Sequence, residues 1–99
     1  MMMRHVVMFR RLAAVEKDMA RQAELAERMR VLVGEIDFIR DWKVSANVLD
    51  RSICWDYLLE SSFDDADAVQ RYLVHPAHVA LIQDLKQYFE WAAVDYVQS

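Results

Sequence analysis

The chain has very few of the residues that form disulfides, sharp turns or flexible loops. Its 99 residues include one Cys, one Pro and one Gly. A single Cys54 excludes an internal disulfide, and no Cys/His cluster stands at zinc spacing, so we expect neither a redox motif nor a metal site. The scarcity of Gly and Pro predicts regular helices and strands joined by few, short loops.

Positive charge and long apolar runs are also lacking. Lys and Arg number 12 against 16 Asp and Glu, which gives a formal net charge of −4. Such a chain, whose basic residues form no cluster, is a poor partner for nucleic acids or anionic membranes. No apolar run approaches the roughly 18 residues of a membrane span, and the amino-terminal apolar segment is too short for a secretory signal. We therefore expect a cytoplasmic protein that binds neither nucleic acid nor membrane.

Apolar residues are plentiful enough for one core. Hydrophobic residues make up 56% of the chain and charged residues 28%. At this length folding buries about 65% of the surface of the open chain, which suffices for a single domain over residues 1–99. The interior of so small a domain leaves little room for a large cofactor, and we expect none.

Apolar spacing predicts elements in the order β-α-β-β-α-α-β. Alternating apolar residues indicate strands, and spacings of three and four indicate helices. The expected ranges are, in order, 4–12, 16–33, 36–48, 53–63, 64–74, 77–89 and 91–97. This order is close to the split βαβ arrangement of a ferredoxin-like α+β fold, with helices on one face of a single antiparallel sheet.

Local signals mark the ends of the helices. Gly34 follows the first helix, where a positive φ is easily accommodated. Asp64 and Asp67 form an acidic variant of the capping signature of the second helix. Pro76 separates the second and third helices, because the residue before proline avoids helical angles and proline suits a first turn. His75 and Pro76 therefore have a structural role, and we expect His75 to donate to a carbonyl that Pro76 frees.

Both faces of the predicted sheet are apolar, although helices cover only one. On the first strand, His5, Val7 and Phe9 lie on one face, and Val6 and Met8 lie on the other. A second subunit is the simplest cover for the remaining face. We therefore expect a homodimer joined through its sheet faces, a dimeric α/β barrel.

Four ordered segments of the chain resemble a known family. They are RHVVMFR at the start, WDYLLESSFDD in the middle, YLVHPAHVAL near the end and VDY at the carboxyl terminus. Together they are similar to the stress-responsive dimeric A/B barrel (Dabb) family, and YLVHPAHV is the most specific of them. The resemblance covers essentially the whole chain. It implies one Dabb domain with a ferredoxin-like protomer, paired as a homodimer through its sheets.

The resemblance also implies candidate site residues. One plant member of the family is a polyketide cyclase of the olivetolic acid type, and it is similar to this chain at residues 69–79 and at His5. By that similarity the catalytic pair is Tyr72 and His78. The expected substrate-binding residues are His5, Val7, Phe9 and Leu81.

The chemistry of Tyr72 and His78 suits such a pair. A neutral His78 can remove a proton from carbon next to a carbonyl. Tyr72 can donate a hydrogen bond to the oxygen that becomes an enolate. The helix break at Pro76 can turn both side chains into one cavity. We expect a pocket between sheet and helices that binds a small apolar carbonyl compound. The alternative is a cofactor-independent, polyketide cyclase-like enzyme. A cofactor-free oxygenase is a third possible class of function.

The same residues also have structural interpretations. A partly buried histidine such as His78 is often a hydrogen-bonded core residue, and Tyr72 suits a core aromatic with a bonded hydroxyl. A metal site built from the three histidines is disfavoured, because no carboxylate stands at matching spacing.

Two acidic residues lie within apolar strands rather than on a charged surface. Asp56 and Asp95 are each expected to pair with an arginine across the dimer interface, with Arg4 and Arg10 as the candidates.

Overall fold

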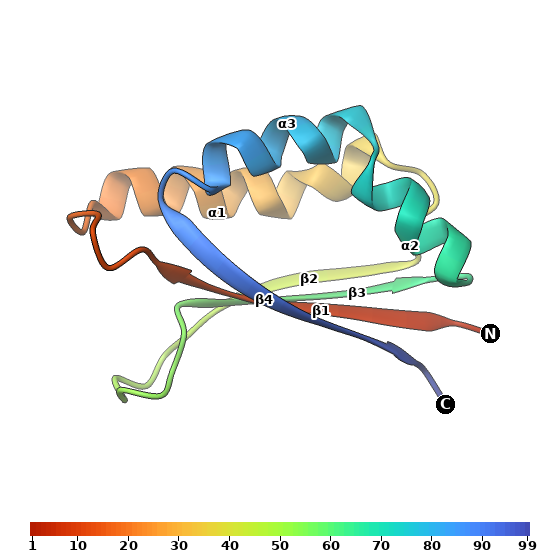
Figure 1. Cartoon of the computed structure of the whole chain (residues 1–99), viewed down its shortest axis with the longest axis horizontal. Coiled ribbons are helices and arrows are strands. Elements are labelled where there is room, and N and C mark those ends of the chain that lie inside the picture. The colour runs from red at the N-terminus through yellow and green to blue at the C-terminus, as the bar shows by residue number, and fades with distance from the viewer.

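The computed structural model describes residues 1–99 and consists of one antiparallel sheet with helices on a single face (Figure 1). Its strands are β1 (Met3–Arg11), β2 (Asp41–Ala46), β3 (Tyr57–Phe63) and β4 (Phe89–Val97), in the spatial order β2-β3-β1-β4. Its helices are α1 (Met19–Val31), α2 (Ala66–Leu73) and α3 (Pro76–Leu85), and a short 3₁₀ helix, η1 (Leu32–Glu35), continues α1. The predicted ferredoxin-like α+β fold is confirmed. None of the helices has both the length and the apolar character needed to cross a membrane.

The central strand β1 divides its side chains between the two faces of the sheet. It pairs antiparallel with β3 on one side and β4 on the other. His5, Val7 and Phe9 are buried against the helices, whereas Met8 points away from them and is 44% exposed. The alternation in the sequence therefore predicted the two faces correctly.

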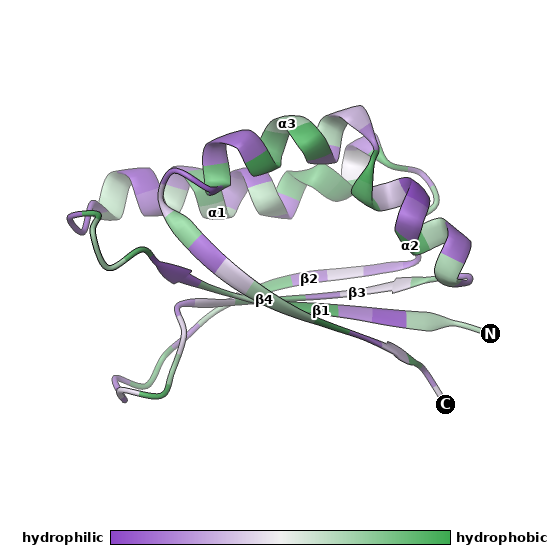
Figure 2. Ribbon diagram, viewed as in Figure 1, coloured by the Kyte–Doolittle hydropathy of each residue, from purple (hydrophilic) through white to green (hydrophobic).

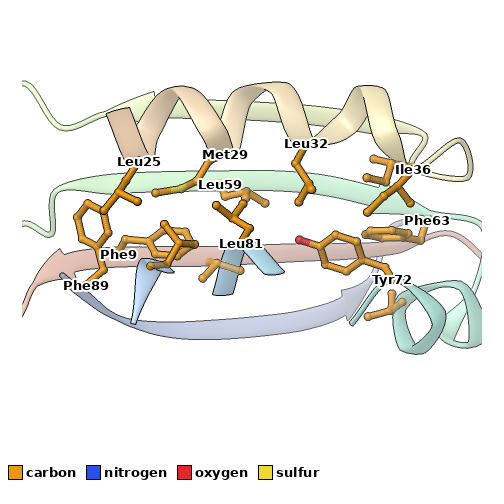
Figure 3. Close-up of a cluster of buried hydrophobic side chains, with 14 of the residues drawn as sticks. Phe9, Leu25, Met29, Leu32, Ile36, Leu59, Phe63, Tyr72, Leu81 and Phe89 are labelled. Atoms are coloured by element: carbon orange, nitrogen blue, oxygen red, sulfur yellow. The ribbon is translucent and has the colours of Figure 1, made fainter. Parts of the chain in front are cut away.

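The core lies between the helices and this face of the sheet (Figure 3). Leu25 and Met29 of α1 and Leu85 of α3 are almost completely buried there. Burying each such side chain contributes about 1.5–3 kcal/mol relative to leaving it exposed. The indole Nε1 of Trp42 donates to the carbonyl of Met29 at 3.1 Å, which ties the edge strand β2 to α1.

The helix caps differ from the predicted ones. Asp65, rather than Asp64, is the N-cap of α2, and its carboxylate accepts the N–H of Ala68 at 2.8 Å. Asp64 instead forms an ion pair with Arg40, with 2.9 Å between Nη2 and Oδ2. Two adjacent aspartates offer the same capping chemistry, so the local signature could not choose between them.

Gly34 does not end the first helix in a left-handed conformation. It lies within η1, and no residue of the chain has a positive φ. The chain leaves α1 by tightening into a 3₁₀ turn, in which the N–H of Ile36 points to the carbonyl of Val33 at 3.4 Å. Such tightening is one way to satisfy the last carbonyls of a helix without a glycine.

Several elements are shorter or longer than the sequence predicted. The second and third strands pair as the expected hairpin, but they begin only at Asp41 and Tyr57. The connection between them projects below the sheet (Figure 1). The third helix ends at Leu85, and β4 already starts at Phe89. Leu85, Tyr88 and Phe89 are all buried, so apolar periodicity gave no sign of where helix ends and strand begins.

The face of the sheet away from the helices is partly apolar, and within the chain only the connection between β2 and β3 lies against it, with Trp55 4.3 Å from the guanidinium of Arg10. Met8, Val94 and Tyr96 are exposed there. Figure 2 shows apolar residues through the middle of β1. Val48 and Ile53, in the connection between β2 and β3, are also exposed.

Within the chain, Asp56 and Asp95 bond to groups other than the arginines expected across a dimer interface. Asp56 accepts the backbone N–H of Arg11 at 2.8 Å within the same chain. Arg4 and Arg10 have ion-pair partners of their own, on the open face of the sheet. These partners are Asp41 and Glu60 for Arg4, and Glu90 for Arg10.

Candidate functional site

A pocket of about 180 Å³ lies between the helices and the sheet, with one wall formed by the edge strand β4. Twelve of its 15 lining residues are hydrophobic, and the other three are His5, His78 and Asp95. The residues predicted to form the site all line it: His5, Val7, Phe9, Tyr72, His78 and Leu81. An apolar cavity of about 150 Å³ can hold benzene, so this pocket suits a ligand of roughly one ring.

The break between α2 and α3 brings Tyr72 and His78 together. His75 is the N-cap of α3, with Pro76 in the first turn, and the Nδ1 of His75 accepts the N–H of Ala77 at 3.1 Å. The predicted role of His75 was therefore wrong in its direction, since it accepts from an N–H rather than donating to a carbonyl. The turn that results places the rings of Tyr72 and His78 4.4 Å apart, centroid to centroid.

His78, rather than His75, forms the hydrogen bond to the carbonyl that is freed at the helix break. Its Nδ1 lies 3.0 Å from the carbonyl oxygen of Leu73, the last residue of α2. Because a carbonyl only accepts, Nδ1 carries the proton and the neutral ring has its lone pair on Nε2. Burial lowers the pKa of His78 by more than the hydrogen bond to the Leu73 carbonyl raises it. His78 is thus held neutral, with an accepting nitrogen available to the pocket.

The Tyr72 hydroxyl is the donor of the pocket. The residue is 2% exposed, and its hydroxyl makes no hydrogen bond within the chain. No fully buried side-chain N or O atom lacks a partner, so this hydroxyl must reach the open space of the pocket. Figure 3 shows it pointing between sheet and helices towards Leu81. Burial raises the pKa of Tyr72, so the hydroxyl stays protonated and can donate.

Aromatic packing fixes the ring of Tyr72. The rings of Phe63 and Trp42 lie 5.1 and 6.1 Å from it, centroid to centroid. His5 lies 5.7 Å away in an edge-on arrangement. A ring enclosed on several sides in this way has little freedom to rotate out of the pocket.

Asp95 is the part of the site that sequence reasoning missed. It lies directly opposite His5 in the pairing of β1 with β4, and its carboxylate forms a hydrogen bond with the Nδ1 of His5. Within the chain its partner is His5, and not Arg4 or Arg10, the candidates expected across a dimer interface. The pairing of Asp95 with His5 follows from the register of the first and last strands, and the sequence alone did not supply that register. The same strand adds Trp91 and Ala93 to the pocket wall.

The polar groups of the pocket do not form a cluster suited to a metal ion. Nowhere in the chain do three His, Cys, Asp or Glu side chains come close enough together to hold one.

Known proteins resemble this chain in sequence and fold. The sequence model described as Stress responsive A/B Barrel Domain matches residues 3–98. An uncharacterised protein of Streptomyces coelicolor is 39% identical over 95 residues, which cover 96% of this chain and 98% of that protein. A crystal structure of a dimeric, ferredoxin-like protein of unknown function from Bacteroides fragilis is 32% identical, with a TM-score of 0.82 and coverage of 96% of this chain and 94% of that one.

Two enzymes share the fold at much lower identity. A hydroxynitrile lyase from Passiflora edulis has a TM-score of 0.82 and 14% identity, over 99% of this chain and 94% of its own. SnoaB, a cofactor-independent oxygenase from Streptomyces nogalater, has a TM-score of 0.73 and 13% identity, over 99% of this chain and 93% of its own. These two likenesses concern the fold alone. The match over residues 3–98, together with the relative at 39% identity, shows that the chain belongs to the stress-responsive A/B barrel (Dabb) domain family.

Proposed function

We propose that this protein is a homodimer that binds a small apolar carbonyl compound in the pocket and moves a proton of that compound without a cofactor. The observation that carries the proposal is the pairing of two groups in one apolar pocket. His78 has an accepting Nε2, and Tyr72 has a donating hydroxyl, and neither atom has a partner within the chain.

The two groups have complementary parts in such a reaction. The Nε2 of His78 removes a proton from carbon next to the carbonyl, and the Tyr72 hydroxyl donates to the carbonyl oxygen as it becomes an enolate oxygen. A neutral histidine is needed as the base, and burial favours the neutral form of His78. A protonated tyrosine is needed as the donor, and burial favours that form of Tyr72. The environment therefore sets each group in the state that its role requires.

The enolate formed in this way can undergo several reactions. The resemblance to a plant polyketide cyclase favours an aldol-type cyclisation among them. The volume of about 180 Å³ favours a product of roughly one ring. Two proteins with the same fold are enzymes, which supports a catalytic use of the fold without naming a substrate.

The homodimer is proposed from the uncovered face of the sheet. Met8 and Val94 are exposed in its middle, where a second sheet would cover them. The protein of Bacteroides fragilis, at 32% identity, is described as dimeric, which supports the same assembly here.

The proposal is tested by following exchange of carbon-bound protons in D₂O. Single-ring ketones, such as cyclohexanone and acetophenone, are first screened for a rise in melting temperature of the native protein. Deuterium incorporation next to the carbonyl of each binding ketone is then measured by mass spectrometry. We expect the native protein to accelerate it and His78→Asn to abolish the acceleration, because Asn keeps a donor for the Leu73 carbonyl but has no accepting nitrogen.

The control variant is Tyr88→Phe, which removes a hydroxyl that is bonded to Gln22 outside the pocket and should leave exchange unchanged. Binding of ketones without any exchange would contradict the catalytic part of the proposal and leave a small-molecule binding protein. Failure of all single-ring ketones to bind would contradict the whole of it.

A further inference from the structure

The pocket contains a second histidine that the proposed reaction does not use. His5 lies on β1 with only 6% of its side chain exposed, and its Nδ1 is hydrogen-bonded to Oδ1 of Asp95 on β4. The two residues are direct neighbours in the antiparallel register, so the sheet itself holds them together. An ionised carboxylate only accepts hydrogen bonds, which places the proton of a neutral His5 on Nδ1.

The other ring nitrogen of His5 faces the pocket. Nε2 makes no hydrogen bond within the chain, and no fully buried side-chain nitrogen or oxygen is left without a partner. Because His5 lines the pocket and is otherwise enclosed, Nε2 has access to the pocket space. This arrangement, in which a carboxylate orients a histidine whose second nitrogen faces a cavity, is the one that proteins use to present a base.

The pocket therefore has two accepting nitrogens around one donor. Tyr72 lies near both of them, with its ring 5.7 Å from that of His5 and 4.4 Å from that of His78, centroid to centroid. In the proposed reaction, the carbonyl oxygen of the ligand accepts a hydrogen bond from the Tyr72 hydroxyl. The carbon that loses its proton lies next to one of the two histidines, so neither group provides a hydrogen bond to the other histidine. A ligand that offered nothing to the second nitrogen would bury it without a partner, at a cost in affinity.

We propose that Asp95 is a positioning residue that holds His5 as a second hydrogen-bond acceptor, and that the natural ligand carries an O–H or N–H donor in addition to its carbonyl. The substrate class is thus a hydroxy- or amino-substituted carbonyl compound of about one ring. This inference rests on the proposed function for the place of the carbonyl at Tyr72. It assigns a separate task to His5 and Asp95, namely recognition of the donor.

The test of the ligand uses two ketones of the same size and shape. 3-Hydroxyacetophenone carries a donor, and 3-methylacetophenone replaces that hydroxyl with a methyl group. At about pH 7 the phenol is neutral, since phenolic groups titrate near pH 10. We expect the native protein to bind the hydroxy ketone about three- to tenfold more tightly, as one neutral hydrogen bond to a buried partner provides.

The test of Asp95 uses Asp95→Asn, with Glu90→Gln as a matched control. The asparagine can donate as well as accept, so His5 is no longer restricted to the tautomer with its proton on Nδ1. We expect the preference for the hydroxy ketone to fall to about twofold or less. Glu90 lies on the same strand but pairs with Arg10 on the open face, so Glu90→Gln should keep the preference.

A second measurement reports on His5 without any ligand. Long-range ¹H–¹⁵N correlation spectra at about pH 7 distinguish a protonated from an unprotonated ring nitrogen. We expect the neutral form of His5 in the native protein to carry its proton on Nδ1, and the neutral form in Asp95→Asn to be a mixture of tautomers. A His5 protonated on both nitrogens, or a tautomer unchanged in Asp95→Asn, would overturn the role of Asp95.

The two proposals fail in different ways. Equal binding of both ketones by the native protein would overturn the need for a donor and leave the proposed function intact. Failure of both ketones to bind would contradict the proposed function and, with it, the ligand class stated here. A hydroxy preference that survives in Asp95→Asn, or that is lost to the same extent in Glu90→Gln, would overturn the assignment to Asp95.

Discussion

Replacing Tyr72 with phenylalanine separates a functional hydroxyl from a structural one. The change removes one oxygen from a residue that is otherwise enclosed by aromatic rings, and it takes away no hydrogen bond within the chain. The folded protein therefore loses no internal partner. We expect the free energy of unfolding to change by less than about 1 kcal/mol, because no buried group is left unsatisfied.

The effect on the proposed reaction should be much larger. Loss of one donor to a developing oxyanion typically costs about 10² to 10³ in rate, which corresponds to about 3–4 kcal/mol of transition-state stabilisation. Deuterium incorporation into a bound single-ring ketone by Tyr72→Phe should fall by that factor. Ketone affinity should fall by much less, since a ground-state carbonyl attracts the hydroxyl less strongly than an enolate does.

Tyr88 provides the matched control, because it is also a buried tyrosine but its hydroxyl is bonded. That hydroxyl donates to Oε1 of Gln22 at 2.9 Å, outside the pocket. Tyr88→Phe should lower the free energy of unfolding by about 1 kcal/mol, measured by urea denaturation, and leave the exchange rate unchanged. The reasoning is refuted if Tyr72→Phe destabilises the protein as much as Tyr88→Phe does while exchange continues at the native rate.

Three further predictions follow from the same structure. Because burial lowers the pKa of His78 in the folded state, the unfolded state binds a proton at this residue more readily. The free energy of unfolding should therefore fall as the pH drops below the ordinary histidine pKa of about 6.5 towards the lowered pKa of the folded state. Urea denaturation at several pH values should show a weaker fall in His78→Asn. Val94→Asp places a charge in the middle of the open sheet face, so sedimentation analysis should show a shift from a dimer towards a monomer of 11.7 kDa. The control Val74→Asp places the same charge at an exposed helix end and should not change the oligomeric state. Asp65→Ala should lower the free energy of unfolding by about 1 kcal/mol through loss of the α2 cap, and a larger loss in Asp64→Ala would contradict the assignment of the cap.

The fold was predictable because its signals are local. The alternation of His5, Val7 and Phe9 with Val6 and Met8 is visible within one strand, and it gave both faces of the sheet correctly. Periods of three and four residues likewise gave the helices. The boundaries were less predictable where apolar residues continue from one element into the next, as they do at the end of α3. There only the backbone hydrogen bonds decide, and no residue type marks the change.

The site was predictable in part. The break at Pro76 suggested that Tyr72 and His78 share a cavity, and both do line one pocket. The family resemblance supplied the roles expected of them, which composition and spacing alone could not have assigned. Asp95 was recognised as unusual, but its partner depends on which residue of β1 stands opposite it. That register joins the two ends of the chain, 90 residues apart, and no local pattern encodes it.

The direction of the hydrogen bonds at the helix break was a different kind of error. His75 was expected to satisfy a carbonyl, and it satisfies an N–H instead, while His78 takes the carbonyl of Leu73. Both ends of a helix leave unpaired groups, and a histidine can serve either kind. The choice has a functional consequence, because the bond to Leu73 leaves the Nε2 of His78 unprotonated.

The most direct test of the central claim is a double-mutant cycle on the exchange of ketone protons in D₂O. Rates are measured for the native protein, Tyr72→Phe, His78→Asn and the double variant. If the two side chains act on one substrate in one transition state, the second change should cost little once the first has been made, so the double variant should exchange at about the rate of His78→Asn. Losses that multiply, or single variants that exchange at the native rate, would contradict the account.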